Sequence, residues 1–304
     1  MNALSFIPLL LALVLSPLLF GVINRTKALF AGRRGPPLLQ TYFDLWKLLR
    51  KGAVYSRTTT WIFRAGPMIG LAATLVAAAL VPLGNFPALV AFPGDFLLFA
   101  GLLGLMRFFT VIAALDTGSS FEGMGASREV FFSALTEPAL LVALATLARQ
   151  TGQLSLSTML EPVSAAHWLQ AGPVLALVII ALLIVLLAEN ARIPVDDPNT
   201  HLELTMIHEV MVLDHGGPDF AFILYSAALK LWLFAALVIG MVLPVTNNAP
   251  LDLLLATGGM FGVAMMVGVI ESIMARLRLV VVPQLLVGAA ALAAMAFLLE
   301  LTLK

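Results

Sequence analysis

The chain has 304 residues, of which 61% are hydrophobic and only 11% are charged, whereas soluble domains carry about 25% charged residues. Its seventeen basic and seventeen acidic residues cancel, so the net charge gives no general attraction to nucleic acid. The absence of cysteine excludes disulfides, thiolate metal sites and iron–sulfur clusters ligated by this chain. Because so few charges cannot cover a soluble fold of this size, the composition predicts a polytopic membrane protein.

Apolar stretches long enough to cross about 30 Å of hydrocarbon recur eight times along the chain. We predict that they are helices, because a single apolar segment in lipid must satisfy its own backbone hydrogen bonds. The first stretch lacks a basic start and a small-residue cleavage site, so we interpret it as a spanning helix and not as a signal peptide. The expected spans are Ala3–Ile23, Ile62–Leu83, Phe96–Leu115, Val130–Ala148, Gly172–Ala188, Phe220–Pro244, Leu251–Ile270 and Leu279–Leu303. The predicted fold class is therefore an all-α helix bundle, with residues 1–304 forming one integral membrane domain.

Lysine and arginine are concentrated in every second loop, which predicts the orientation in the membrane. The loop after the first span is by far the most basic, and Arg128, Arg192 and the pair Arg276 and Arg278 follow the third, fifth and seventh spans. We therefore expect these loops to face the cytoplasm and both termini to lie outside.

The basic loop over residues 25–61 contains a predicted amphipathic helix at Pro36–Lys51. Its apolar stripe follows helical spacing, and polar residues occupy the other face. The stripe consists of Leu38, Leu39, Tyr42, Leu45, Trp46 and Leu49. We expect such a helix to lie in the plane of the membrane interface.

The loop over residues 190–219 is acidic, which suggests a docking surface for a partner or a polar cavity. It also contains His201, His208 and His215, spaced seven residues apart. This spacing fits no compact chelate, so no metal site is expected.

Ionisable residues inside the predicted spans are the sharpest functional signal, because each costs several kcal/mol if it has no partner. Arg107, Glu137, Glu189, Lys230 and Glu271 are such residues. Burial raises the pKa of a carboxyl and nearby cations lower it, so these groups could form a proton relay. The alternative is that they form fixed ion pairs.

Four segments, in their order along the chain, carry a family resemblance. They are residues 32–40 (GRRGPPLLQ) leading into 44–49 (DLWKLL), 115–119 (LDTGS) with 125–129 (GASRE), 135–138 (LTEP) and 188–196 (AENARIPVD). Together they resemble the subunit 1 family of respiratory complex I. The similarity is closest to the branch in energy-converting nickel–iron hydrogenases, of the formate hydrogenlyase and hydrogenase-4 type.

The resemblance implies a non-catalytic, eight-helix coupling subunit in the cytoplasmic membrane of a prokaryote. Such a subunit links a soluble redox arm to proton or sodium translocation and binds no redox centre itself. The implied partners are antiporter-like membrane subunits, lipids, and soluble hydrogenase-like large and small subunits. The soluble partners would hold the iron–sulfur clusters and a nickel–iron centre.

The resemblance also assigns roles to residues of this chain. Glu137, Glu189, Asp196 and Glu203 match the family's carboxylate chain, and Arg107, Lys230 and Glu271 complete the predicted proton relay. The residues expected to face the redox arm are Arg33, Arg34, Asp44, Lys47, Lys51 and Arg128.

Residues 198–203 (PNTHLE) depart from the acidic run that complex I has at this point, with Asn199 and His201 in place of two acids. This favours a hydrogenase-type complex over quinone reduction. Two alternatives stay open: a quinone-site subunit of a true complex I, and a passive membrane anchor for the redox arm.

Overall fold

The computed structural model describes residues 3–160, 165–197, 206–244, 246 and 248–303. Across these residues the regular structure is helical, apart from an isolated β-bridge between Leu83 and Phe86. The described part contains eight helices long and apolar enough to cross a membrane. They are α1 (Phe6–Phe30), α3 (Trp61–Leu80), α4 (Asp95–Asp116), α5 (Ser120–Thr151), α7 (Ala165–Glu189), α8 (Gly217–Val242), α9 (Ala249–Ile273) and α10 (Val282–Leu303). The predicted all-α membrane bundle is confirmed.

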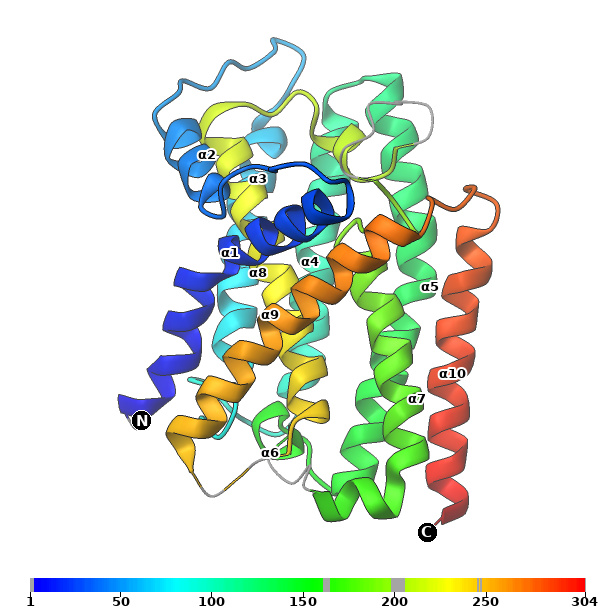
Figure 1. Cartoon of the computed structure of the whole chain (residues 1–304). Coiled ribbons are helices and arrows are strands. Elements are labelled where there is room, and N and C mark those ends of the chain that lie inside the picture. The colour runs from blue at the N-terminus through cyan, green and yellow to red at the C-terminus, as the bar shows by residue number, and fades with distance from the viewer. Residues whose placement is uncertain (1–2, 161–164, 198–205, 245, 247, 304) are drawn as a thin grey trace.

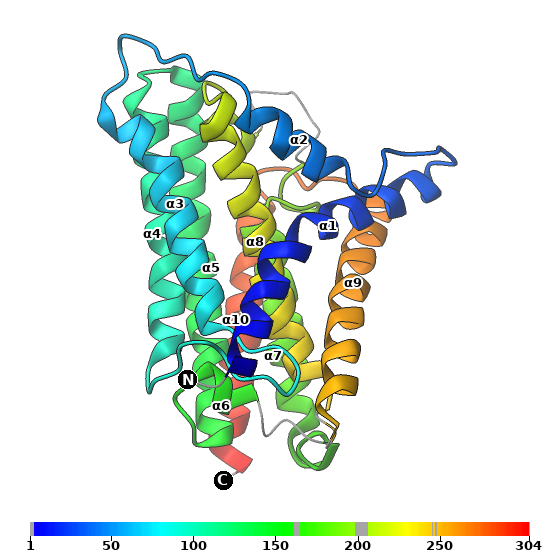
Figure 2. The ribbon, with the colours of Figure 1, turned by 90° about the vertical axis from the view of Figure 1, so that its left-hand side faces the viewer.

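Four short helices connect or precede the spans: η1 (Ala3–Ser5), α2 (Gln40–Leu49), α6 (Leu156–Leu160) and η2 (Glu209–Val212). Figure 1 shows α2 at one end of the bundle, and both chain termini and α6 toward the other end. We call these the α2 end and the α6 end. In Figure 2, α1 rises from the α6 end and then turns across the α2 end. Pro17, inside α1, removes a backbone donor and so favours a bend.

The start of α5 differs from the predicted one. The helix begins at Ser120 and not at Val130, because Glu122, Arg128 and Glu129 lie among its first ten residues and interrupt the apolar stretch. Glu122 in the first turn favours a helix start, since a negative charge stabilises the positive end of the helix dipole. The helix therefore continues beyond its apolar part toward the α2 end.

The innermost spans are α8 and α7, with 67% and 61% of their most apolar windows buried. Trp232 and Phe234 of α8 are fully buried, and the Phe234 ring packs edge-on against Phe99 at a centroid distance of 6.4 Å. The side chains of Glu189 on α7 and Lys230 on α8 are accordingly only 5% and 12% exposed.

The predicted amphipathic helix is shorter than expected, since α2 covers Gln40–Leu49. It packs on α1 and α8 with Thr41 buried, whereas Phe43 and Trp46 on its outer side are 58% and 61% exposed. The side chain of Arg50 covers the Trp46 ring, with 4.5 Å between the guanidinium carbon and the ring centroid. Exposed aromatic side chains flanked by basic residues are typical of helices that lie in the membrane interface.

Candidate functional site

Arg107, in α4, brings together three carboxylates from two other helices. Its Nε lies 3.1 Å from Oε1 of Glu129, and its two terminal nitrogens bind Glu137 and Glu189. One guanidinium can do this because it carries five N–H donors in a planar fork. The side chain is only 10% exposed, so the group forms inside the bundle. We call Arg107 with Glu129, Glu137, Glu189 and Lys230 the Arg107 network.

The local structure of α5 explains why two of these acids converge. Glu129 and Glu137 are eight residues apart, which is slightly more than two helical turns, so both point to the same face. Between them, the hydroxyl of Thr136 donates to Oε1 of Glu189 at 3.1 Å. Glu129 and Glu189 are buried, whereas the side chain of Glu137 is 49% exposed. Glu137 is therefore the point at which the network reaches the surface of this chain.

Lys230, in α8, adds a second cation to the network. Its Nζ lies 3.8 Å from Oε2 of Glu189, and the side chain is 12% exposed. Two cations oppose three carboxylates, which leaves one negative charge uncompensated within the network when all are ionised. A buried uncompensated charge is costly, so a further positive charge nearby is favoured.

His208, just before η2, supplies that charge. Its Nε2 lies 3.0 Å from Oε2 of Glu129, and its Nδ1 lies 3.4 Å from Oδ2 of Asp196. Burial lowers the pKa of His208, but the two carboxylates outweigh burial and raise this pKa to about 9. The imidazole is therefore protonated at neutral pH.

Asp196 anchors the loop that carries His208. Its carboxylate accepts backbone N–H bonds from Ile207 at 3.2 Å and from His208 at 3.1 Å, and Arg276 binds its other oxygen at 2.9 Å. Burial raises the pKa of Asp196, but the bonds and charge of His208, together with the charge of Arg276, lower it below its ordinary value. The predicted relay residue Asp196 thus joins the Arg107 network through His208.

Glu271 belongs to a different group of charges. Its fully enclosed carboxylate lies 2.8 Å from Nζ of Lys27 and 3.4 Å from a terminal nitrogen of Arg192. The Arg192 guanidinium also stacks over the Phe20 ring, 4.7 Å from its centroid. Within the described residues, no ion pair joins Glu271 to the Arg107 network. We call Glu271, Lys27 and Arg192 the Glu271 triad.

Two cavities meet at the Arg107 network. The larger one, about 340 Å³, opens toward the α2 end, and its lining includes Glu129, His208 and Lys230. The smaller one, about 270 Å³, lies between α4 and α5 and is lined by Glu137. Both are lined by Arg107 and Glu189, so this pair separates them.

The larger cavity has a polar lining suited to ordered water. Among the described residues, Asn190 Oδ1 and Arg192 Nε are buried with no hydrogen-bond partner, and both residues line the cavity. Buried polar atoms are commonly satisfied by ordered water when a cavity is large enough to hold it. Water in this cavity would be a medium for proton exchange beside Arg107.

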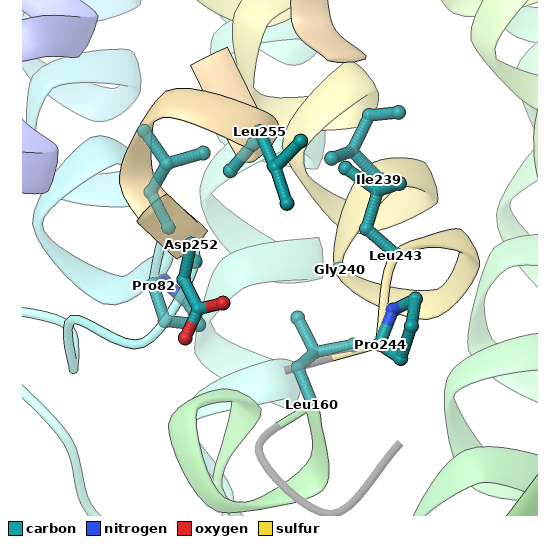
Figure 3. A pocket seen from close by; sticks show the side chains of 11 residues that line it. Pro82, Leu160, Ile239, Gly240, Leu243, Pro244, Asp252 and Leu255 are labelled. Atoms are coloured by element: carbon teal, nitrogen blue, oxygen red, sulfur yellow. The ribbon is translucent and has the colours of Figure 1, made fainter. Parts of the chain in front are cut away.

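A third cavity lies at the α6 end, and none of the residues of the Arg107 network lines it. Figure 3 shows Asp252 beside Leu160, Pro82 and Pro244. The cavity measures about 30 Å³, which is enough for one or two waters. One Asp252 oxygen accepts bonds from the backbone nitrogen and hydroxyl of Thr246 at 2.9 and 2.6 Å, so this aspartate fixes the turn before α9.

Of the residues expected to face the redox arm, four are exposed and two are bonded within the chain. Arg33, Arg34, Lys47 and Lys51 are exposed at the α2 end. Asp44 instead lines the larger cavity and accepts a 2.8 Å bond from Gln40. Arg128 donates to the carbonyl of Met206 at 2.7 Å, which attaches the His208 loop to α5. Glu203, expected in the relay, lies outside the described residues.

Glu129, His208, Arg276 and Lys27 were not predicted as site residues. Glu129 lies two turns before Glu137 on one helix face, which is a signal that the sequence does carry, but the predicted apolar span begins only at Val130. The sequence marks His208 only as a possible metal ligand. The pairing of Arg276 and Lys27 depends on the packing of distant segments, for which the sequence gives no local signal.

Eight long apolar helices in the described part of the chain, with a buried charged network between two cavities, define a polytopic membrane protein with a polar interior. The chain belongs to the NADH dehydrogenase family, whose model matches residues 3–301. This confirms the resemblance to the complex I subunit 1 family seen in the motifs.

Two curated relatives and one solved structure refine this assignment. The chain is 30% identical to formate hydrogenlyase subunit 4 of Escherichia coli (strain K12) over 289 residues, covering 91% of this chain and 92% of the relative. It is 32% identical to hydrogenase-4 component C of the same organism over 244 residues, covering 79% and 75%. A chain in the structure of the membrane-bound sulfane sulfur reductase, an archaeal respiratory membrane complex, has the same fold, with a TM-score of 0.83, 98% coverage of both chains and 21% identity.

Proposed function

We propose that this chain is the membrane-embedded coupling subunit of a hydrogenase-type or complex I-like oxidoreductase, and that it links electron transfer in a soluble arm to translocation of protons or sodium ions. The names of the relatives support this assignment. The observation that carries it is the continuous series of contacts from Asp196 through His208, Glu129 and Arg107 to Glu137 and Glu189.

The chemistry of arginine determines how a proton moves through this series. The Arg107 guanidinium does not release a proton in a protein, so it holds the carboxylates in place and does not carry protons itself. Protons therefore pass between Glu129, Glu189 and Glu137 through water in the two cavities. The half-exposed Glu137 is the exit from this chain toward a neighbouring membrane subunit.

Coupling follows from the balance of charge in the network. A carboxylate close to a cation favours its ionised form, and one that loses the cation favours its protonated form. A redox-linked displacement of the His208 loop would change the positive charge beside Glu129. The network would then take up or release a proton in response.

The exposed basic residues of the α2 end are the proposed docking surface for the soluble arm. The proposed orientation has this end in the cytoplasm and both termini outside the inner membrane of a prokaryote. The soluble large and small subunits would carry the iron–sulfur clusters and a nickel–iron centre, antiporter-like subunits would continue the ion path, and this chain would bind no redox cofactor.

A quinone-site subunit is the second candidate, and the larger cavity favours it. Its volume of about 340 Å³ falls within the range of small-molecule sites, about 300–1,000 Å³. A hydrogenase-type subunit needs this cavity only for water. Binding of a water-soluble quinone analogue to the assembled complex would distinguish the two candidates.

The substitution Glu137→Gln tests the coupling function. It keeps size and hydrogen bonding but removes the titrating group. The complex should assemble and retain electron transfer to an artificial acceptor. The rate of pH-gradient formation in vesicles should fall below about a tenth of the rate of the unsubstituted complex.

The matched control is Glu300→Gln, a buried carboxylate in α10 that lines neither cavity of the network. This variant should pump normally. Normal pumping by Glu137→Gln as well would reject the relay and favour the passive anchor.

A further inference from the structure

The position of His208 extends the proposed function to the first step of the proton path. We infer that His208 is the proton-loading residue of the larger cavity, which exchanges its proton with Glu129 through Nε2 while Asp196 positions the ring through Nδ1. The inference depends on the proposed function, and the experiments below are chosen so that the two can fail separately.

Each ring nitrogen of His208 faces a carboxylate from a different part of the chain. Nε2 is 3.0 Å from Glu129 of α5, and Nδ1 is 3.4 Å from Asp196 of the segment after α7. The side chain is 21% exposed and lines the larger cavity. Water in this cavity can therefore reach the ring, and the ring can reach the Arg107 network.

The two carboxylates differ in a way that assigns their roles. Oδ1 of Asp196 accepts from the Asp197 backbone at 3.0 Å and from Arg276 at 2.9 Å, and Oδ2 accepts from two further backbone N–H groups. A carboxylate with this many donors stays ionised. It holds the Nδ1 proton and stabilises the imidazolium, as the aspartate of a Ser-His-Asp triad does, so Nε2 is the nitrogen free to exchange.

The transfer step is balanced without any oxidant or reductant. The Nε2–H bond of the His208 imidazolium breaks, and an O–H bond forms on Oε2 of Glu129, which leaves a neutral imidazole and a neutral acid. Glu129 then releases the proton to water on the path to Glu189 and Glu137. Nε2 regains a proton from water in the larger cavity, which resets the ring.

The charged groups around His208 make its protonation sensitive to proton transfer onto Glu129. Glu129 from α5 and Asp196 face it directly, Arg276 binds Asp196, and Arg107 from α4 binds Glu129. Lys230 from α8 pairs with Glu189 from α7, and both line the larger cavity together with His208, Glu209 and Arg192. Because the carboxylates raise the pKa of His208 to about 9, neutralising Glu129 makes the ring easier to deprotonate.

Close packing fixes the loop that carries His208. The segment lies so close to Gly125 of α5 that a Cβ there would be 2.9 Å from the backbone carbonyl oxygen of Ile207 and 2.3 Å from the side-chain Cγ1 of Val210. Arg128 also donates to the carbonyl of Met206. The distance between Nε2 and Glu129 is therefore set by the contact of the loop with α5.

The first experiment replaces His208 with Gln in the native complex. Gln keeps hydrogen-bonding capacity but cannot carry a proton. We expect normal assembly and artificial-acceptor activity, with pH-gradient formation reduced at least tenfold. His215→Gln is the matched control, because His215 stacks on Phe63 at 3.9 Å and, among the described residues, no carboxylate forms an ion pair with its ring; it should pump normally.

The second experiment measures titration directly, by isotope-edited infrared spectroscopy of the unmodified complex with labelled histidine. One histidine should titrate near pH 9, and this signal should disappear in His208→Gln and move to lower pH in Asp196→Asn. Added imidazole should restore pumping to His208→Ala, because the larger cavity can admit it.

These outcomes separate the inference from the proposed function. Normal pumping by His208→Gln together with loss of pumping by Glu137→Gln would overturn the loading role and leave the relay intact. Normal pumping by both would overturn the proposed function. If His208→Gln does not assemble, the titration of the unmodified complex decides, and the absence of a histidine titrating above about pH 8 overturns the inference.

Discussion

The Arg107 network and the Glu271 triad are built from the same residue types but are arranged for different tasks. The Arg107 network has more carboxylates than cations, two cavities at its sides and a half-exposed Glu137. In the triad, one fully enclosed carboxylate is held by two cations. Buried charge alone therefore does not predict proton exchange. We expect exchange where carboxylates outnumber cations and themselves line a cavity, as Glu137 and Glu189 do. We expect a structural role for a fully enclosed carboxylate held by two cations, even though one of these cations, Arg192, lines the larger cavity.

Among single substitutions in the two groups, the removal of Arg107 should have the largest effect. Arg107→Met would leave three carboxylates close together with only Lys230 and His208 to oppose them. Since breaking a buried ion pair costs about 3–5 kcal/mol, we expect much less of the subunit in membranes, measured by quantitative immunoblotting. Arg64→Met, which removes a cation that packs on the Tyr55 ring, should have little effect. Normal abundance and pumping of Arg107→Met would show that the convergence on Arg107 is not required.

Substitution of Glu271 should separate stability from pumping. Glu271→Gln leaves Lys27 and Arg192 without their countercharge, but Lys27 is 24% exposed and can hydrate. We expect a loss of about 2–3 kcal/mol in stability, measured as a lower thermal unfolding temperature of the purified complex. The number of protons moved per electron should be unchanged in the molecules that assemble. A reduced ratio would instead place Glu271 in the proton path, as the sequence suggested.

A smaller and more specific effect is expected from Gly125→Ala. The added Cβ would push the His208 loop away from α5, at a cost of about 1–3 kcal/mol. His208 would lose contact with Glu129, so its titration should move from near pH 9 toward about 6.5, measured by the same infrared titration. Gly123→Ala is the control, because a Cβ there meets no atom within 4 Å. An unchanged titration in Gly125→Ala would mean that the loop can shift without moving His208.

The sequence was sufficient to predict the spans and much of the Arg107 network. Hydropathy found the eight long helices because lipid imposes their length and backbone pairing. The rule that ionisable residues in spans are functional candidates selected Arg107, Glu137, Glu189 and Lys230, which the structure joins. The start of α5 was missed because a helix that leaves the membrane loses its apolar signal but keeps its backbone hydrogen bonds. Glu129 was missed for the same reason, because it lies before the predicted start of this helix.

The separate position of Glu271 could not be predicted, because it depends on how α1 crosses α9. Gly268 allows this approach, since a Cβ there would lie 2.7 Å from Cβ of Thr26 and 3.0 Å from the carbonyl oxygen of Ile23. The crossing sets Lys27 beside Glu271, one turn further along α9. No local pattern distinguishes a glycine used for such a crossing from one that faces lipid.

The length of α5 has a mechanical consequence. At 32 residues it is roughly 48 Å long, against about 30 Å of hydrocarbon, so a substantial part projects beyond the bilayer core. Its first turn is bonded to the segment that follows His208, since Glu122 accepts the Asp214 N–H at 3.2 Å. The same helix carries Glu129 and Glu137. A tilt imposed at the projecting end of this helix would therefore displace Glu129 and Glu137 together.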